Sequence, residues 1–244
     1  MARLPEGTTI FMLSDLQGST RAWESQPKAM RAAMARHDAI LAMAVRRGAM
    51  VEYGPALALI VVDIQNDFAD RKGSLYVKGG EAVVPVANRE IDRAVAAGSP
   101  VFYTQDWHPQ STPHFKKDGG IWPVHCVGGT WGAEFHPGLR IEGEIIRKGT
   151  GGEDGYSGFT VRDPKSGDQR ATALGSRLHE KGIRKVVVLG LATDYCVGAT
   201  ALDAAAGGWD TTVLREGIRA VDLNPGDGER MISGLIATGV HIAS

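Results

Sequence analysis

The chain has 244 residues, which suffices for one sizeable domain but not for two large ones. Its 27 Lys and Arg residues balance 28 Asp and Glu residues, so the charge argues against binding to nucleic acid or anionic lipid and favours a small-molecule partner. It has two cysteines, no secretory pattern in its start MARLPEGTTIF and no apolar stretch near the roughly 18–20 residues of a membrane span, so we expect a reduced, cytoplasmic protein.

The first 54 residues carry a pattern of their own. TTIFMLS predicts a strand, and helices are predicted at GSTRAWES and over residues 27–47. One face of the second helix carries a repeating stripe, formed by Met30, Met34, His37, Leu41 and Val45. So short a segment buries little apolar area by itself, so we expect it to dock on the main domain or on a second subunit, as a homo-oligomer would allow. We predict this strand-helix extension over residues 1–54 and a main domain over residues 55–244.

From Ala56 onward, short apolar runs alternate with amphipathic stretches, which is typical of a parallel sheet covered by helices. Strands are predicted over residues 58–62, 100–104, 144–148, 185–189, 211–214 and 240–242. Helices are predicted over residues 82–97, 169–181, 194–206 and 228–238, and the first two stop at Gly98 and Gly182, as helices often do. The pattern predicts a doubly wound α/β domain with a mostly parallel six-stranded sheet and helices on both faces.

Reactive side chains follow or end four of these strands. They are Asp63, Asp106 with His108, Lys148, and Cys196. Ligands bind beyond the carboxyl ends of the strands in such sheets, so we expect a site where these residues converge. Each residue taken alone is also an ordinary polar end to a strand.

Cys196 is the candidate nucleophile. A free cysteine is barely ionised at neutral pH, so a nucleophilic one needs a local positive field, which a helix N-terminus supplies. Thr193 or Asp194 is a suitable N-cap, and either would place Cys196 in the first turn of a helix. The alternative is a buried structural cysteine.

Asp63 is the candidate base for this thiol. It follows the most apolar strand, where burial raises a carboxyl pKa and a neighbouring Lys148 lowers it, so that it can accept and return a proton. Lys148 would also favour the thiolate. The alternative for this pair is a buried structural salt bridge.

Asp106, His108, His114 and His125 form a candidate metal site. Residues two apart on an extended segment face the same side, so Asp106 and His108 can converge on one ion. His114 and His125 can reach it from the following loop. This set suits Zn, Fe or Mn, with zinc slightly preferred. The alternative is a group of hydrogen-bonded loop histidines, which is also our interpretation of the other four, His37, His136, His179 and His241.

The segment GTGGEDGYSGF, residues 149–159, is rich in glycine. It matches neither phosphate-loop spacing, and we interpret it as a flexible loop over the site. Phe68, Trp122 and Tyr156 lie near the candidate segments, where a flat aromatic substrate would need walls. Core packing is the alternative for each of them.

From about Ala56 to the C-terminus, the chain resembles the nicotinamidase branch of the isochorismatase-like hydrolases. The resemblance rests on ALIVVDIQNDF, TQDWHP, WPVHCVGGTWGAEF, IIRKGT and GLATDYCVGATALDA. It implies a catalytic triad of Asp63, Lys148 and Cys196. It also implies a metal site formed by Asp106, His108, His114 and His125. A cis peptide bond is implied before the nucleophile, between Leu191 and Ala192.

The reaction implied by the resemblance is hydrolysis of nicotinamide to nicotinate and ammonia in NAD salvage, with pyrazinamide as a further substrate. The metal would hold the pyridine nitrogen, and the oxyanion hole would be the amides of Ala192 and Cys196. The ring would contact Phe68, Trp122, Tyr156, Leu191 and Ala192. Cys196 would form a thioester that water hydrolyses. The alternative is another hydrolase of the superfamily, acting on carbamoyl compounds or isochorismate, but those branches generally lack the full metal set.

The start of the chain has a different resemblance. IFMLSDLQGSTRAWE is similar to the opening of class III nucleotide cyclase domains, where Asp15 would match a metal-binding residue. A cyclase also needs a second metal-binding Asp on a hairpin with a GDG motif, and here the chain reads MVEYGPA. We therefore expect no cyclase activity, and the alternative for this segment is a signalling or association role.

Overall fold

The computed structural model describes residues 51–243. Residues 1–50 of the extension predicted over residues 1–54, with its apolar stripe and Asp15, lie outside the described residues. Tyr53, which precedes the predicted boundary, already contacts the main domain, because its hydroxyl donates to Glu90 at 3.1 Å. Across the described residues, no helix combines the length and the apolar character required to cross a membrane.

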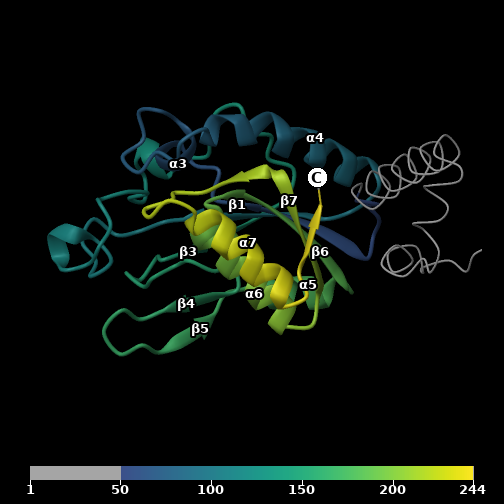
Figure 1. Cartoon of the computed structure of the whole chain (residues 1–244). Helices are drawn as coiled ribbons and strands as arrows, with labels where there is room; N and C mark the ends of the chain where they lie inside the picture. The colour runs from purple at the N-terminus through teal and green to yellow at the C-terminus, as the bar shows by residue number, and fades with distance from the viewer. Residues whose placement is uncertain (1–50, 244) are drawn as a thin grey trace, which may run out of the picture. The chain divides into compact units, whose positions relative to one another are not determined.

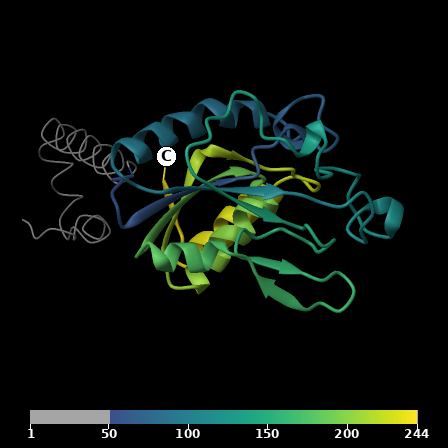
Figure 2. The same cartoon turned by 180° about the vertical axis from the view of Figure 1, so that it is seen from behind.

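A six-stranded sheet forms the centre of the domain, in the order β3-β2-β1-β6-β7-β8, and every neighbouring pair in it is parallel. Its strands are β1 Leu57–Val62, β2 Val101–Asp106, β3 Glu144–Lys148, β6 Lys185–Leu191, β7 Asp210–Arg219 and β8 His241–Ala243. A separate antiparallel hairpin joins β4 Thr160–Arg162 to β5 Gln169–Ala171, and it lies apart from the sheet in Figure 2. The predicted sheet is confirmed.

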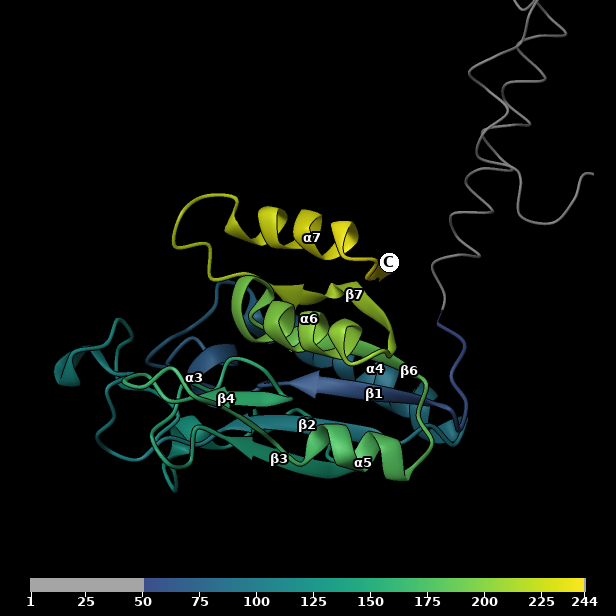
Figure 3. The ribbon, with the colours of Figure 1, turned by 90° about the horizontal axis from the view of Figure 1, so that it is seen from below.

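Helices cover both faces of the sheet (Figure 1). One face carries α3 Asn66–Ala69 and α4 Val83–Ala96, and the other carries α5 Leu174–Glu180, α6 Gly198–Ala206 and α7 Asp227–Ala237. In Figure 3, α5 and α6 lie in front of the strands and α4 lies behind them. Single 3-10 turns occur at Gly80–Ala82, Lys116–Asp118 and Trp131–Ala133, and a π-helical turn at Thr193–Val197. The doubly wound α/β fold is therefore confirmed.

Strand β1 explains the apolar run LALIVV. Its alternate residues pack into two different cores, Leu59 and Val61 beneath α4, and Ile60 and Val62 beneath α5 and α6. All six residues of the strand are buried. Burial on both faces requires a continuous apolar sequence and places the first polar residue, Asp63, at the carboxyl end of the sheet.

The helix predicted over residues 169–181 is wrong in its first part. Gln169–Ala171 is the strand β5, which pairs with β4, and α5 begins only at Leu174. The residues of β5 are exposed, whereas Leu174 and Leu178 are buried. The apolar stripe that stabilises the helix therefore starts at Leu174.

Gly190 allows β6 to approach β1 closely. Its φ is +127°, and a Cβ there would collide with the carbonyl oxygen of Val62. We expect Gly190→Ala to lower the free energy of unfolding by about 3 kcal/mol, because the collision is with a central strand. Gly234→Ala is the matched control, since its added Cβ meets no atom within 4 Å inside α7. It should raise the free energy of unfolding by up to about 1 kcal/mol in the same denaturant titration.

Candidate active site

Four neighbouring strands bring the predicted catalytic residues together. Asp63 follows β1, Asp106 ends β2, Lys148 ends β3, and Cys196 comes soon after β6. These strands are adjacent and parallel in the order β3-β2-β1-β6, so their carboxyl ends meet at one edge. All four residues are buried.

Lys148 lies at the centre of this group. Its Nζ is 2.8 Å from Asp63 Oδ2, 2.7 Å from Asp106 Oδ1 and 3.7 Å from Cys196 Sγ. It also donates to the carbonyl oxygen of Gly155. Burial alone would lower the lysine pKa, but the two carboxylates outweigh it and hold the pKa well above its usual range. Lys148 is therefore a buried cation.

Asp63 is placed to exchange a proton with Cys196. A carboxylate oxygen of Asp63 and the sulfur of Cys196 lie within 4.8 Å of one another. Thr104 Oγ1 donates to Asp63 Oδ1 at 2.7 Å, and Asp63 Oδ2 accepts no well-aligned hydrogen bond. Burial raises the pKa of Asp63, and attraction to Lys148 offsets this only in part. The backbone of Asp63 has a φ of +47°, an uncommon conformation for a residue other than glycine.

Burial determines the ionisation of Cys196. It raises the pKa of the thiol well above its usual range, and the opposing attraction to Lys148 is smaller. Lys148 lowers the thiol pKa, as expected, but burial raises it by more. A raised thiol pKa disfavours the thiolate, so a nucleophilic Cys196 would need a base such as Asp63.

The prediction that Thr193 or Asp194 caps a helix is wrong. Cys196 lies in the π-helical turn Thr193–Val197 that precedes α6, the N-cap position is Ala192, and no side chain caps the turn. The Asp194 carboxylate instead accepts the backbone N–H groups of Val221 and Asp222, at 2.9 and 2.8 Å. Its acceptor oxygens are thus used by a neighbouring loop. The peptide bond between Leu191 and Ala192 is cis, as the resemblance implies.

Three histidines converge beside the triad. His108, His114 and His125 are buried, and one ring nitrogen of each lies within 4.8 Å of those of the other two. Asp106 Oδ2 is 3.5 Å from His108 Nε2 and 3.8 Å from His125 Nε2. The Asp106 carboxylate thus lies between Lys148 and the histidines and faces each with a different oxygen.

The chemistry of this cluster fits a divalent transition metal. Both ring nitrogens of His108 are buried without a hydrogen-bond partner, which is costly unless a further ligand satisfies one of them. His125 Nδ1 is 2.8 Å from the carbonyl oxygen of Pro123, so Nδ1 is its donor and Nε2 is left as a ligand atom. Burial alone would raise the pKa of Asp106, but attraction to Lys148 and His108 holds it well below its usual range. The site therefore offers imidazole nitrogens and an anionic oxygen.

A pocket opens over Cys196 and the histidines, with about 410 Å³ of empty space including its mouth. All five predicted substrate-binding residues line it, namely Phe68, Trp122, Tyr156, Leu191 and Ala192. Cys196 and Asp106 also line it, as do two of the histidines, but Asp63 and Lys148 do not. The sequence analysis missed four lining residues, which are Leu75, Val77, Tyr195 and Val221.

The aromatic walls of the pocket are held by one another. Trp122 Nε1 donates to the hydroxyl of Tyr156 at 2.7 Å, and the rings of Trp122 and Tyr195 meet edge to face with centroids 4.8 Å apart. Tyr195 directly precedes the nucleophile, a sequence signal that could have found it. The glycine-rich segment contributes Gly155 and Tyr156 to the pocket, so it lies at the site as predicted.

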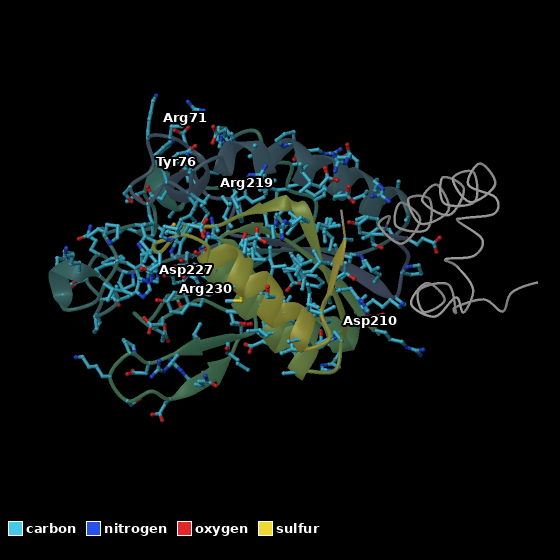
Figure 4. The ribbon with its side chains drawn as sticks, in the orientation of Figure 1. Arg71, Tyr76, Asp210, Arg219, Asp227 and Arg230 are labelled. Atoms are coloured by element: carbon cyan, nitrogen blue, oxygen red, sulfur yellow. The ribbon has the colours of Figure 1, made fainter. Side chains whose placement is uncertain are left out.

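The apolar wall formed by Leu75 and Val77 belongs to the segment between α3 and α4. Two labelled side chains of this segment, Arg71 and Tyr76, lie near one another in Figure 4. Arg71 and Tyr76 both donate hydrogen bonds to the Glu81 carboxylate, at 2.7 and 2.6 Å. These hydrogen bonds lower the pKa of Glu81 to about 2, and the one from Tyr76 has the larger effect. No sequence motif marks this wall.

Several known proteins resemble this chain in sequence and fold. The family model described as the isochorismatase domain matches residues 57–240. Nicotinamidase of Escherichia coli (strain K12) is 36% identical over 206 residues, covering 77% of this chain and 94% of that protein. The crystal structure of pyrazinamidase of Pyrococcus horikoshii in complex with zinc has a TM-score of 0.70 and 37% identity, covering 78% of this chain and 99% of that one. The structure of PnC1 from L. infantum in complex with nicotinate has a TM-score of 0.71 and 36% identity, covering 80% and 96%. Since the family model matches most of its length, the chain belongs to the isochorismatase family.

Proposed function

We propose that this chain is an amidohydrolase that converts nicotinamide to nicotinate and ammonia, and that it also accepts pyrazinamide. One observation carries the proposal. A buried Asp63–Lys148–Cys196 group lies at a pocket with aromatic walls, directly beside three histidines and Asp106. The relatives named nicotinamidase and pyrazinamidase support the same substrate class.

The pocket favours a small flat ring that carries a carboxamide. Phe68, Trp122 and Tyr156 supply aromatic surface, and Leu191 and Ala192 line the side next to the nucleophile. Aromatic walls bind a planar ring with little need for rearrangement. Nicotinamide and pyrazinamide share this shape, and both carry a ring nitrogen.

Asp63 and Cys196 perform the chemistry in two halves. Asp63 takes the thiol proton, and the Cys196 sulfur bonds to the carboxamide carbon while the amides of Ala192 and Cys196 stabilise the oxyanion. The carbon–nitrogen bond then breaks, and ammonia leaves with the proton from Asp63. Water adds to the remaining thioester as Asp63 accepts a proton, the carbon–sulfur bond breaks, and the proton returns to the sulfur. Nicotinate and the free thiol result.

Asp106, His108, His114 and His125 would hold one divalent transition ion, either zinc, iron or manganese. Zinc is supported by the zinc complex of the Pyrococcus horikoshii pyrazinamidase. When bound, such an ion supplies a Lewis acid that attracts the ring nitrogen of the substrate. The protein contributes three imidazoles and the anionic Asp106, a donor set that suits such an ion.

The test is ammonia release from nicotinamide by the full chain, with and without a chelator. We expect equal amounts of ammonia and nicotinate, loss of turnover after chelation, and recovery with zinc, manganese or ferrous iron. Benzamide is the matched control, because it lacks the ring nitrogen and should turn over much more slowly.

Two results would contradict the proposal. Full turnover after complete removal of metal would exclude a metal-dependent reaction. Ammonia release from a carbamoyl compound but not from nicotinamide would assign the chain to another activity of the family.

A further inference from the structure

Asp154 contacts one of the proposed metal ligands from a distant part of the chain. It lies in the glycine-rich segment between β3 and β4, and its Oδ1 is 2.6 Å from Nδ1 of His114. The side chain of His114 is 4% exposed and that of Asp154 is 17% exposed. Asp154 does not line the pocket, so it has no contact of its own with a bound substrate.

The backbones on both sides of this contact are fixed. Asp154 and Arg162 exchange two backbone hydrogen bonds, of 2.8 and 2.9 Å, which anchor Asp154 to the last residue of β4. Thr112 Oγ1 donates to the carbonyl oxygen of Gly152 at 2.6 Å and accepts the His114 N–H at 3.2 Å. The loop of His114 and the glycine-rich segment are thus joined at two points, Thr112–Gly152 and His114–Asp154, and further hydrogen bonds hold each segment in place.

The chemistry of the contact determines the tautomer of His114. An ionised carboxylate only accepts hydrogen bonds, so His114 must carry its proton on Nδ1 and present the lone pair of Nε2. Metal-binding histidines usually donate their other N–H to a carboxylate or a carbonyl oxygen, which fixes the ring and raises its basicity. Among the three histidines of the site, His125 uses the Pro123 carbonyl, and only His114 has a carboxylate on Nδ1.

We propose that Asp154 is a positioning residue for the metal site, which holds His114 as the Nδ1–H tautomer with Nε2 available to the ion. This inference rests on the proposed metal site. Gly155, the residue after Asp154, accepts a hydrogen bond from Lys148, so a change in the backbone here would also disturb the triad. Side-chain substitutions are therefore the appropriate test.

Zinc affinity of the full chain is the first measurement, by competition with a chromophoric chelator. We expect Asp154→Ala to weaken zinc binding about 10- to 100-fold. Asp154→Asn should weaken it less, because the amide oxygen still accepts the Nδ1 proton. Asp163→Ala is the matched control, since the Asp163 carboxylate lies in the hairpin loop, accepts the N–H groups of Lys165 and Ser166, and should leave zinc affinity unchanged.

The tautomer of His114 is the second measurement, by NMR of the side-chain nitrogens in the metal-free protein. The native chain should show His114 with its proton on Nδ1, and Asp154→Ala should shift the population towards Nε2–H. A variant that merely disturbed folding would lower the thermal midpoint of the metal-free protein without this change. If Asp154→Ala changed neither the zinc affinity nor the His114 tautomer, the role of Asp154 would be wrong while the proposed metal site would stand. If His114→Ala left the zinc affinity unchanged, the proposed metal site itself would be wrong.

Discussion

Replacing Cys196 by alanine is expected to abolish ammonia release from nicotinamide, with kcat falling on the order of 10⁴-fold or more. The reason is that the variant has no sulfur to form the thioester. Water would have to attack the carboxamide directly, with only the oxyanion amides and substrate binding to assist. Zinc content should stay at the native level, because the sulfur is not part of the histidine cluster. The measurements are ammonia release over hours and metal analysis of the purified variant.

Cys126→Ala is the control for this result. Cys126 is the other cysteine of the chain, is fully buried and does not line the pocket. Burial raises the pKa of its thiol well above the usual range, and its nearest polar partner is the Gly132 carbonyl oxygen at 3.8 Å. We expect Cys126→Ala to keep a kcat close to the native value. Native turnover by Cys196→Ala, or loss of turnover only in Cys126→Ala, would reject the assignment of the nucleophile.

The convergence of the catalytic residues could be predicted from the sequence because it depends on sheet geometry. A strand buried on both faces needs a continuous apolar run, as in β1, and the first polar residue after it marks the carboxyl end. Asp63 follows such a run and Cys196 comes soon after another, β6, whereas Lys148 ends the edge strand β3, which is only partly buried. Parallel neighbours bring those ends to one edge. The order of the strands in the sheet then shows which of these residues contact one another.

Features that depend on loop contacts could not be predicted in this way. Leu75, Val77 and Val221 reach the pocket from loops that carry no periodic pattern. Asp194 is a good N-cap by residue type, but its carboxylate accepts hydrogen bonds from the backbone N–H groups of Val221 and Asp222. These outcomes depend on segments that are distant in the chain, whereas propensity and periodicity are local.

The ionisation state of the thiol was also beyond a sequence argument. The sign of each neighbour's effect on Cys196 follows from its charge, but the net pKa depends on how completely the sulfur is buried. Only the packed structure supplies that quantity. A raised thiol pKa makes a base such as Asp63 necessary, so the proposed mechanism depends on how completely the Cys196 sulfur is buried.

Lys148→Met is expected to lower the free energy of unfolding by about 3–5 kcal/mol, because it leaves two buried carboxylates, Asp63 and Asp106, without their cation. It should also abolish ammonia release at temperatures where the variant is still folded. The pKa of Asp63 is already raised by burial, and loss of Lys148 raises it further. A protonated Asp63 cannot take the thiol proton. Denaturant unfolding and ammonia release, both on metal-free and zinc-loaded protein, measure the two effects.

The double variant Lys148→Met/Asp106→Asn separates stability from catalysis. Asp106→Asn removes one of the two unpaired charges, so the double variant should recover part of the lost free energy of unfolding. Activity should not recover, because Asp63 still lies buried without a cation and because Asp106, a proposed metal ligand, is also replaced. If the double variant were no more stable than Lys148→Met, the uncompensated charge of the buried carboxylates would not be the cause of the loss. If it regained turnover, Lys148 would not be what keeps the base ionised, and the proposed role of the lysine would be wrong.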